Sequence, residues 1–203
     1  MLGSITPLGE RGRGSRWWLT AASYVLASAL GGVVVGATAG LAGAVLAEGG
    51  QVLSAGGALL VIALAALAGL AIDGGCLGLR MPTLRRQVNE RWIGRYRGWV
   101  VGLGFGFQLG LGVATIITAS ATWACLTAAV ASQSVPAGAL IGLVFGAVRA
   151  APLLLGAGTS TPQAVGRLHL RLASWARPAD RLVRSCQAGV AAAAVLLAIP
   201  ALT

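Results

Sequence analysis

Apolar stretches long enough to cross a lipid bilayer dominate this sequence. A bilayer core of about 30 Å requires about 20 consecutive apolar residues in a helix. Five stretches of the chain approach or exceed that length, and they cover residues 17–47, 54–79, 99–131, 137–158 and 183–202. Only 10% of the residues are charged, far below the roughly 25% of a soluble domain. The sequence therefore predicts an all-α, polytopic transmembrane helical bundle of about five spans.

The arginines indicate how these spans are oriented. All fifteen basic residues are arginine; three precede the first stretch, six lie in residues 80–97 and five in residues 167–184. The other two connections contain none. Because cytoplasmic loops carry an excess of Lys and Arg, this alternation predicts the N-terminus inside and the C-terminus outside a cytoplasmic (inner) membrane. Basic residues distributed in this way do not indicate nucleic acid as a partner, despite the net charge of +10.

A cleavable signal peptide is an alternative interpretation of the start of the chain. An arginine-bearing segment precedes an apolar run that reaches Ala27-Ser28-Ala29, which has the A-x-A form of a cleavage site. Cleavage there would invert all later spans and place the connection with six arginines outside. We therefore expect residues 1–16 to be a flexible basic cytoplasmic arm and residues 17–203 to be a single transmembrane domain.

Two cytoplasmic connections have the pattern of helices that lie on a membrane surface. In residues 82–97, apolar side chains recur every four residues opposite arginines, and Pro82 suits the first helical position. Residues 162–181 repeat the pattern after Thr161 and Pro162, a cap and first-position pair. Such helices bind anionic headgroups, here at the cytoplasmic face. Both an anchored connector and a docking helix for another protein remain open interpretations.

Glycine at every fourth position is the clearest periodic signal. Glycines at this spacing line one helical face, where two helix backbones can approach closely. The glycines are Gly32, Gly36 and Gly40 in the first stretch, Gly98, Gly102, Gly106 and Gly110 in the third, and Gly138, Gly142 and Gly146 in the fourth. The pattern predicts glycine-zipper packing among these stretches. The first and fourth sets, in spans of opposite direction, also resemble an inverted repeat of the kind found in transporters, and chance is the alternative in a chain so rich in Gly and Ala.

The third stretch carries a polar stripe through an otherwise apolar helix. Its 33 residues would form a helix of about 50 Å, so it has to tilt, protrude or break. Spacings of seven, three and four residues place four side chains on one face: Gln108, Thr115, Thr118 and Thr122. Such groups can hydrogen-bond neighbouring helices or line a path for a solute. We treat them as candidates for a transport path.

Two charged residues lie within apolar stretches and join this candidate path. Asp73 is near the cytoplasmic end of the second stretch, and Arg149 is in the cytoplasmic half of the fourth. Charges inside a membrane usually pair with each other or face a polar cavity. The sequence therefore predicts an Asp73–Arg149 ion pair, with separate snorkelling of both side chains to the inner interface as the alternative.

Catalytic chemistry finds little support in the sequence. Cys76, Cys125 and Cys186 lie far apart and form no CxxC motif. His169 is the only histidine, so neither a metal cluster nor a Ser-His-Asp site can be assembled around it. We expect no catalytic residue, no metal ligand and no cofactor. A membrane enzyme of thiol chemistry would require Cys76 and Cys186 to converge near the cytoplasmic side.

Residues 104–116, GFGFQLGLGVATI, resemble a helix of a known superfamily. This is the Gly/Phe-rich helix that opens a repeat in the cytochrome c biogenesis (CcdA/DsbD) proteins and the LysE/TauE-type exporters. The resemblance implies inverted three-helix repeats and movement of reducing equivalents or small solutes across the membrane. A thiol-redox relative would carry Pro-Cys where this chain has Val113-Ala114-Thr115. Five spans would leave one repeat incomplete.

These observations favour a small transporter-like protein that moves a small solute or ion across the cytoplasmic membrane. We expect it to need no cofactor, and a homo-oligomer remains an open interpretation of its assembly. The alternative is a non-catalytic accessory or assembly subunit of a larger membrane complex. A polar cavity that touches Gln108, Thr115, Asp73 or Arg149 would favour transport. A solid glycine-packed bundle with a groove of small residues on its surface would favour the accessory subunit.

Overall fold

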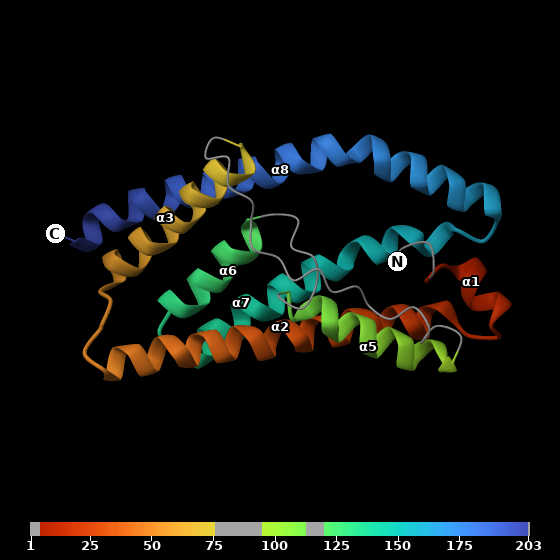
Figure 1. The fold of residues 1–203 in the computed structure, drawn as a ribbon, viewed down its shortest axis with the longest axis horizontal. Coiled ribbons are helices and arrows are strands. Elements are labelled where there is room, and N and C mark those ends of the chain that lie inside the picture. Colours follow the sequence, from red (N-terminus) through yellow and green to blue (C-terminus); the bar gives the residue numbers. More distant parts are fainter. Residues whose placement is uncertain (1–4, 76–94, 113–119, 203) are drawn as a thin grey trace.

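The computed structural model describes residues 5–75, 95–112 and 120–202. These residues are mainly helical, and no β-strand occurs among them, so the predicted all-α class is confirmed (Figure 1). The elements are α1 (Pro7–Gly12), α2 (Trp17–Glu48), α3 (Ala55–Asp73), α5 (Gly98–Gly110), α6 (Ala121–Ala131), α7 (Val135–Ala150), the 3₁₀ helix η1 (Ala151–Gly158) and α8 (Pro162–Leu202).

Four of the described helical segments are long and apolar enough to cross a membrane. They are Trp17–Glu48, Ala55–Asp73, Val135–Gly158 and Pro162–Ala201. The chain therefore has the helices of a multi-pass membrane protein. A bilayer-spanning helix needs about 20 residues, which all four segments approach or exceed.

The third predicted stretch, residues 99–131, differs from a single long helix. Its described residues form two shorter helices, because α5 ends at Gly110 and α6 begins at Ala121. Gly112 adopts a φ of 67°, a left-handed conformation that a right-handed helix cannot contain and that glycine adopts at no steric cost. The length of this stretch requires the helix to tilt, protrude or break, and the structure shows that it breaks after α5.

Helix α8 joins two segments that the sequence separates. A surface helix over residues 162–181 and a distinct span over residues 183–202 are expected, whereas α8 is one helix of 41 residues. It runs along the length of the molecule in Figure 1. The junction contains no glycine or capping pair that would end a helix, and Arg184 binds Asp180 one turn earlier at 2.8 Å. The predicted surface helix over residues 82–97 lies almost entirely outside the described residues.

Residues 5–16 are packed against the bundle, in contrast to the flexible arm expected there. The Thr6 hydroxyl caps α1 by accepting a hydrogen bond from the Gly9 amide at 3.1 Å. Ile5 is 2% exposed and belongs to a core cluster that includes residues of α2, α5, α7 and η1. Glu10 is completely buried and accepts a hydrogen bond from the Thr20 hydroxyl at 2.9 Å. Apolar burial and a satisfied carboxylate thus hold this segment on the end of α2.

The helices form two groups. Helix α2 packs mainly against α5 and α7, and α3 packs mainly against α8 and α6. Helix α6 also contacts α2 and α7 and so links the groups. In Figure 1, α3 and α8 lie along one side of the molecule and α2, α5 and α7 along the other.

Glycine faces make the first group compact. Gly32 and Gly142 lie opposite each other in α2 and α7, and a Cβ atom added at either one would overlap the carbonyl oxygen of the other. On α5, a Cβ atom at Gly110 would overlap the Ser28 carbonyl of α2. The Ser28 hydroxyl in turn donates to the Gly146 carbonyl of α7 at 2.7 Å. Ser28 is therefore the point where all three helices meet at backbone contact.

A glutamine ties together the two connections at the far end of α2. The Gln133 side-chain amide donates to the Gln51 carbonyl at 2.8 Å, and its oxygen accepts from the Leu53 amide at 3.0 Å. These two bonds join the α2–α3 connection to the α6–α7 connection.

We expect Gln133→Ala to lower the free energy of unfolding by about 1 kcal/mol. The effect is small because both hydrogen bonds are exposed, and an exposed hydrogen bond contributes little to stability. Detergent-solubilised protein unfolded by heat gives the measurement, with the exposed Gln163→Ala as control; equal stability of both variants would contradict the tie.

Candidate intramembrane site at the interrupted helix

The end of α3 meets the beginning of α6 through a carboxylate. Asp73 is the last residue of α3, and Ser120 is the N-cap residue of α6. The Asp73 Oδ1 and Oδ2 atoms accept hydrogen bonds from the Ser120 backbone amide at 3.3 and 3.1 Å. Oδ2 also accepts from the Ser120 hydroxyl at 2.6 Å. Asp73 therefore caps α6 from another helix, and the positive end of the α6 dipole favours its negative charge.

A buried glutamine of α8 extends this contact. Gln187 is 5% exposed, and its amide nitrogen donates to the Ser120 hydroxyl at 2.9 Å and to the Ala66 carbonyl of α3 at 3.1 Å. Gly69 makes room for it, since a Cβ atom there would overlap the Gln187 amide nitrogen and the Ser120 hydroxyl oxygen. The three residues Asp73, Ser120 and Gln187, which we name the polar cluster, thus join α3, α6 and α8.

The local sequence explains why the cluster forms at this place. Ser120 makes no side-chain cap bond to its own helix, so its amide and hydroxyl are available to Asp73. A helix that begins inside an apolar stretch needs partners for its first amide groups, because lipid supplies none. A carboxylate from a neighbouring helix meets that requirement here.

Arg149 lies on the other side of α6 from Asp73. Its Nη1 atom is 3.5 Å from the Thr122 hydroxyl, and its guanidinium carbon lies 5.5 Å from the centre of the Phe145 ring, within cation–π range. The predicted Asp73–Arg149 ion pair is wrong: the carboxylate binds Ser120, and α6 separates α3 from α7 (Figure 1). Both charges instead contact polar groups of the same short helix.

Two of the four residues predicted to form a polar stripe lie among the described residues. Gln108 is half-buried on α5, and Thr122 lies in α6, so these two do not share one helix. Thr115 and Thr118 lie outside the described residues. The polar stripe through a continuous third stretch is replaced, in the described part, by polar groups on two separate helices.

Two cavities beside α6 are lined chiefly by apolar side chains. One has a volume of about 630 Å³ and lies between α6 and α7, where Thr122 and Arg149 supply its polar groups. The second, of about 400 Å³, lies between α3, α6 and α8 and is bordered by Gln187. Cys125 and Cys186 both line the second cavity and are free thiols, whereas Cys76 lies outside the described residues. The polar cluster therefore borders apolar space.

Sequence reasoning missed two members of the polar cluster. Gln187 is the one amide side chain in residues 183–202, so an isolated polar residue in an apolar span was the signal that could have identified it. Ser120 carried no such signal, because serine is small and common at helix packing faces. Its role depends on the helix break before it.

The comparisons with known proteins give no information on function. No protein-family model, curated protein or solved structure matches it. The resemblance of residues 104–116 to the CcdA/DsbD and LysE/TauE-type proteins stays a prediction from sequence. These residues support a multi-pass helical membrane protein in which a polar cluster holds the beginning of α6 to α3 and α8.

Proposed function

We propose that this protein is a small transporter-like membrane protein that moves a small solute or ion across the cytoplasmic membrane. The observation that carries the proposal is the break between α5 and α6, with Asp73 at the beginning of the second half-helix. In this proposal α5 and α6 together make the third of five crossings, with the N-terminus inside and the C-terminus outside. Helices α2, α5 and α7, joined by glycine-zipper packing, are the part of the protein that does not move in this proposal.

The energetic cost of the break supports a functional role. A carboxylate such as that of Asp73, at the end of α3, costs free energy in an apolar environment unless it is hydrogen-bonded. Backbone groups released by a helix break must also find partners within the protein. A passive bundle gains nothing from either cost, whereas half-helix ends that face a bound solute or ion are a recurrent construction in secondary transporters.

The two helix groups suggest how a path could open. Backbone contacts at Gly32 and Gly142 hold α2 against α7, so this pair resists sliding. The second group is joined at Ser120 by hydrogen bonds that protonation or a bound cation at Asp73 would change. Loss of those bonds would free the beginning of α6 to move against α7. The oxygen atoms of Asp73, Ser120 and Gln187 are the ligand type that small hard cations prefer. A proton would bind to the Asp73 carboxylate.

Ion flux in vesicles tests the proposal. Purified protein in liposomes that contain a pH-sensitive or a Na⁺-sensitive dye is exposed to an imposed H⁺ or Na⁺ gradient, and the initial rate of ion entry is measured. We expect entry above that of protein-free vesicles, and loss of most of it in Asp73→Asn. The control is Asp180→Asn, because Asp180 is an exposed carboxylate of α8. Equal rates in Asp73→Asn and wild type would contradict the role of Asp73.

An accessory subunit is the second candidate, and the apolar cavity between α6 and α7 favours it. The α7 side of this cavity carries three exposed apolar residues, Leu140, Val144 and Val148, which are 61%, 55% and 66% exposed. Another membrane protein could cover such a surface through van der Waals packing. This candidate predicts no ion entry above that of protein-free vesicles for either gradient.

A further inference from the structure

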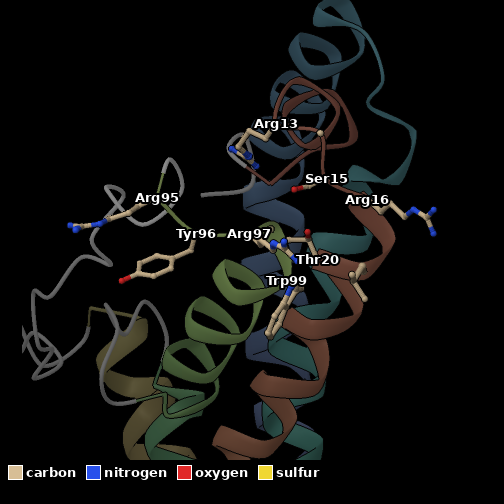
Figure 2. Close-up of a pocket in the computed structure, with 11 residues that line it drawn as sticks. Arg13, Ser15, Arg16, Thr20, Arg95, Tyr96, Arg97 and Trp99 are labelled. Atoms are coloured by element: carbon tan, nitrogen blue, oxygen red, sulfur yellow. The ribbon is translucent and has the colours of Figure 1, made fainter.

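A basic cavity of about 820 Å³ lies where α2 and α5 begin, at the opposite end of α2 from the Gln133 tie (Figure 2). Two chain segments line it, residues 13–20 and residues 95–99. They contribute four arginines: Arg13, Arg16, Arg95 and Arg97. In Figure 2, Arg97 lies centrally below Arg13 and Ser15, and Arg16 and Arg95 extend to opposite sides.

The charge of this cavity is strongly positive. No carboxylate lines it among the described residues. Arg13 is paired with Glu10, which is buried behind the cavity. Arg16, Arg95 and Arg97 form no ion pair with another described residue. A cavity with these three guanidinium groups attracts a ligand with negative charge and several acceptor oxygens, and phosphate matches the donor geometry of arginine.

The back of the cavity is fixed by tertiary contacts. Glu10 accepts a hydrogen bond from the Thr20 hydroxyl at 2.9 Å, and a Cβ atom added at Gly98 would overlap the Glu10 carboxylate. The Trp17 indole also donates to the Ile5 carbonyl at 3.4 Å. These contacts hold α1, α2 and α5 together, so the two arginine-bearing segments keep their relative positions without a ligand.

The cavity is continuous with an apolar surface that suits lipid tails. Leu19 and Trp99 both line it and are 54% and 41% exposed. Further along α5, Leu103 and Phe107 follow Trp99 at intervals of four residues and are each 39% exposed, so an apolar stripe leads away from the arginines. Figure 2 shows Trp99 below Arg97, beside the helices. Tryptophan at such a position is typical of the level of the headgroups.

We propose that this cavity binds the phosphate-bearing headgroup of an anionic phospholipid from the cytoplasmic leaflet. Arg97, at the centre of the cavity, would contact the phosphate oxygens, and Arg16 and Arg95 on its two sides would add to the positive potential that attracts the headgroup. The acyl chains would lie along Leu19 and Trp99. Basic pockets at the cytoplasmic ends of membrane helices are suited to lipid headgroups of this kind. The inference rests on the N-inside orientation of the proposed function but not on transport, because it uses none of the residues of the polar cluster.

Retention of lipid by the full-length protein tests this site. Protein in detergent is mixed with phosphatidylglycerol or with phosphatidylcholine, and bound lipid is counted by native mass spectrometry. We expect Arg16→Gln/Arg97→Gln to weaken phosphatidylglycerol binding by about tenfold or more, given the contribution of each arginine near a membrane surface. The control is Arg177→Gln/Arg181→Gln, which removes the same charge from exposed positions of α8. Binding of phosphatidylcholine should be equal in all proteins.

Three outcomes would overturn the proposal. Equal weakening in the two double variants would show that only net charge matters. Unchanged binding in Arg16→Gln/Arg97→Gln would exclude the cavity. Displacement of phosphatidylglycerol by millimolar inorganic phosphate would assign the site to a free anion in place of a lipid. Arg16→Lys/Arg97→Lys should retain most of the binding, and its thermal unfolding together with that of the glutamine variant shows whether folding is affected.

Discussion

Gly142→Ala is expected to lower the free energy of unfolding by about 1–3 kcal/mol, the usual cost of overpacking a close contact. A methyl group at this position would overlap the Gly32 carbonyl oxygen and also approach the Gly36 Cα atom at 3.0 Å. Both obstacles are backbone atoms of α2, which no rotamer change can move away. Helices α2 and α7 would have to separate along the whole face that they share.

Gly189→Ala is the matched control because it should change stability in the opposite direction. Gly189 also lies in an apolar helix, α8, but a Cβ atom added there meets nothing within 4 Å. Alanine favours helix over glycine by about 1 kcal/mol, so this variant should be slightly more stable than wild type. The measurement is unfolding by SDS in mixed micelles, followed by circular dichroism. Equal effects at the two positions would show that glycine affects only helix propensity and not packing.

The glycine pattern shows what the sequence could predict and what it could not. Spacing of four residues is a local property, so the helical faces of Gly32 and Gly142 can be located without a structure. The partner of each face is a long-range property, and nothing local indicates that α2 uses separate glycines against α5 and α7. Ser28, where the three helices meet, has no sequence signal beyond its small size.

Helix boundaries were less predictable for a related reason. Gly102 and Gly106 lie inside α5, whereas Gly112 follows the end of that helix with a left-handed conformation. The same residue type therefore both continues and ends helices in this stretch. The distinction depends on whether the following helix finds a cap, which Asp73 supplies from 47 residues away in the sequence.

Whether a charged residue is buried depends on its tertiary contacts more than on its neighbours in the sequence. In the sequence, Glu10 is an acidic residue among arginines and indicates a solvated arm. Its burial requires the Thr20 hydroxyl and a glycine at position 98 on a distant helix. The sequence predicts a functional role for Asp73 because this residue lies in an apolar stretch, and charge alone predicts Arg149 as its partner. The structure shows that a helix N-terminus supplied the positive partner.

Ser120→Ala is expected to lower the free energy of unfolding by about 1.5–3 kcal/mol, because hydrogen bonds to charged groups have this value. The Ser120 side chain is 1% exposed and bonds both Asp73 and Gln187. Its removal leaves a carboxylate and an amide with one hydrogen-bond partner fewer. Ser174→Ala is the control, since the exposed Ser174 hydroxyl bonds only the Arg171 carbonyl of its own helix.

A double variant separates the network from simple loss of volume. Gln187→Leu alone removes the donor to the Ala66 carbonyl and to Ser120, so it too should be destabilising. If Ser120 and Gln187 act as one network, Ser120→Ala/Gln187→Leu should cost less than the sum of the two single variants by about 0.5–3 kcal/mol, as coupled residues do. Additive costs would mean that each residue acts independently and that the polar cluster is two separate contacts. Coupling would establish that α6 is held to both α3 and α8 at its first turn, where any opening of the interrupted stretch has to begin.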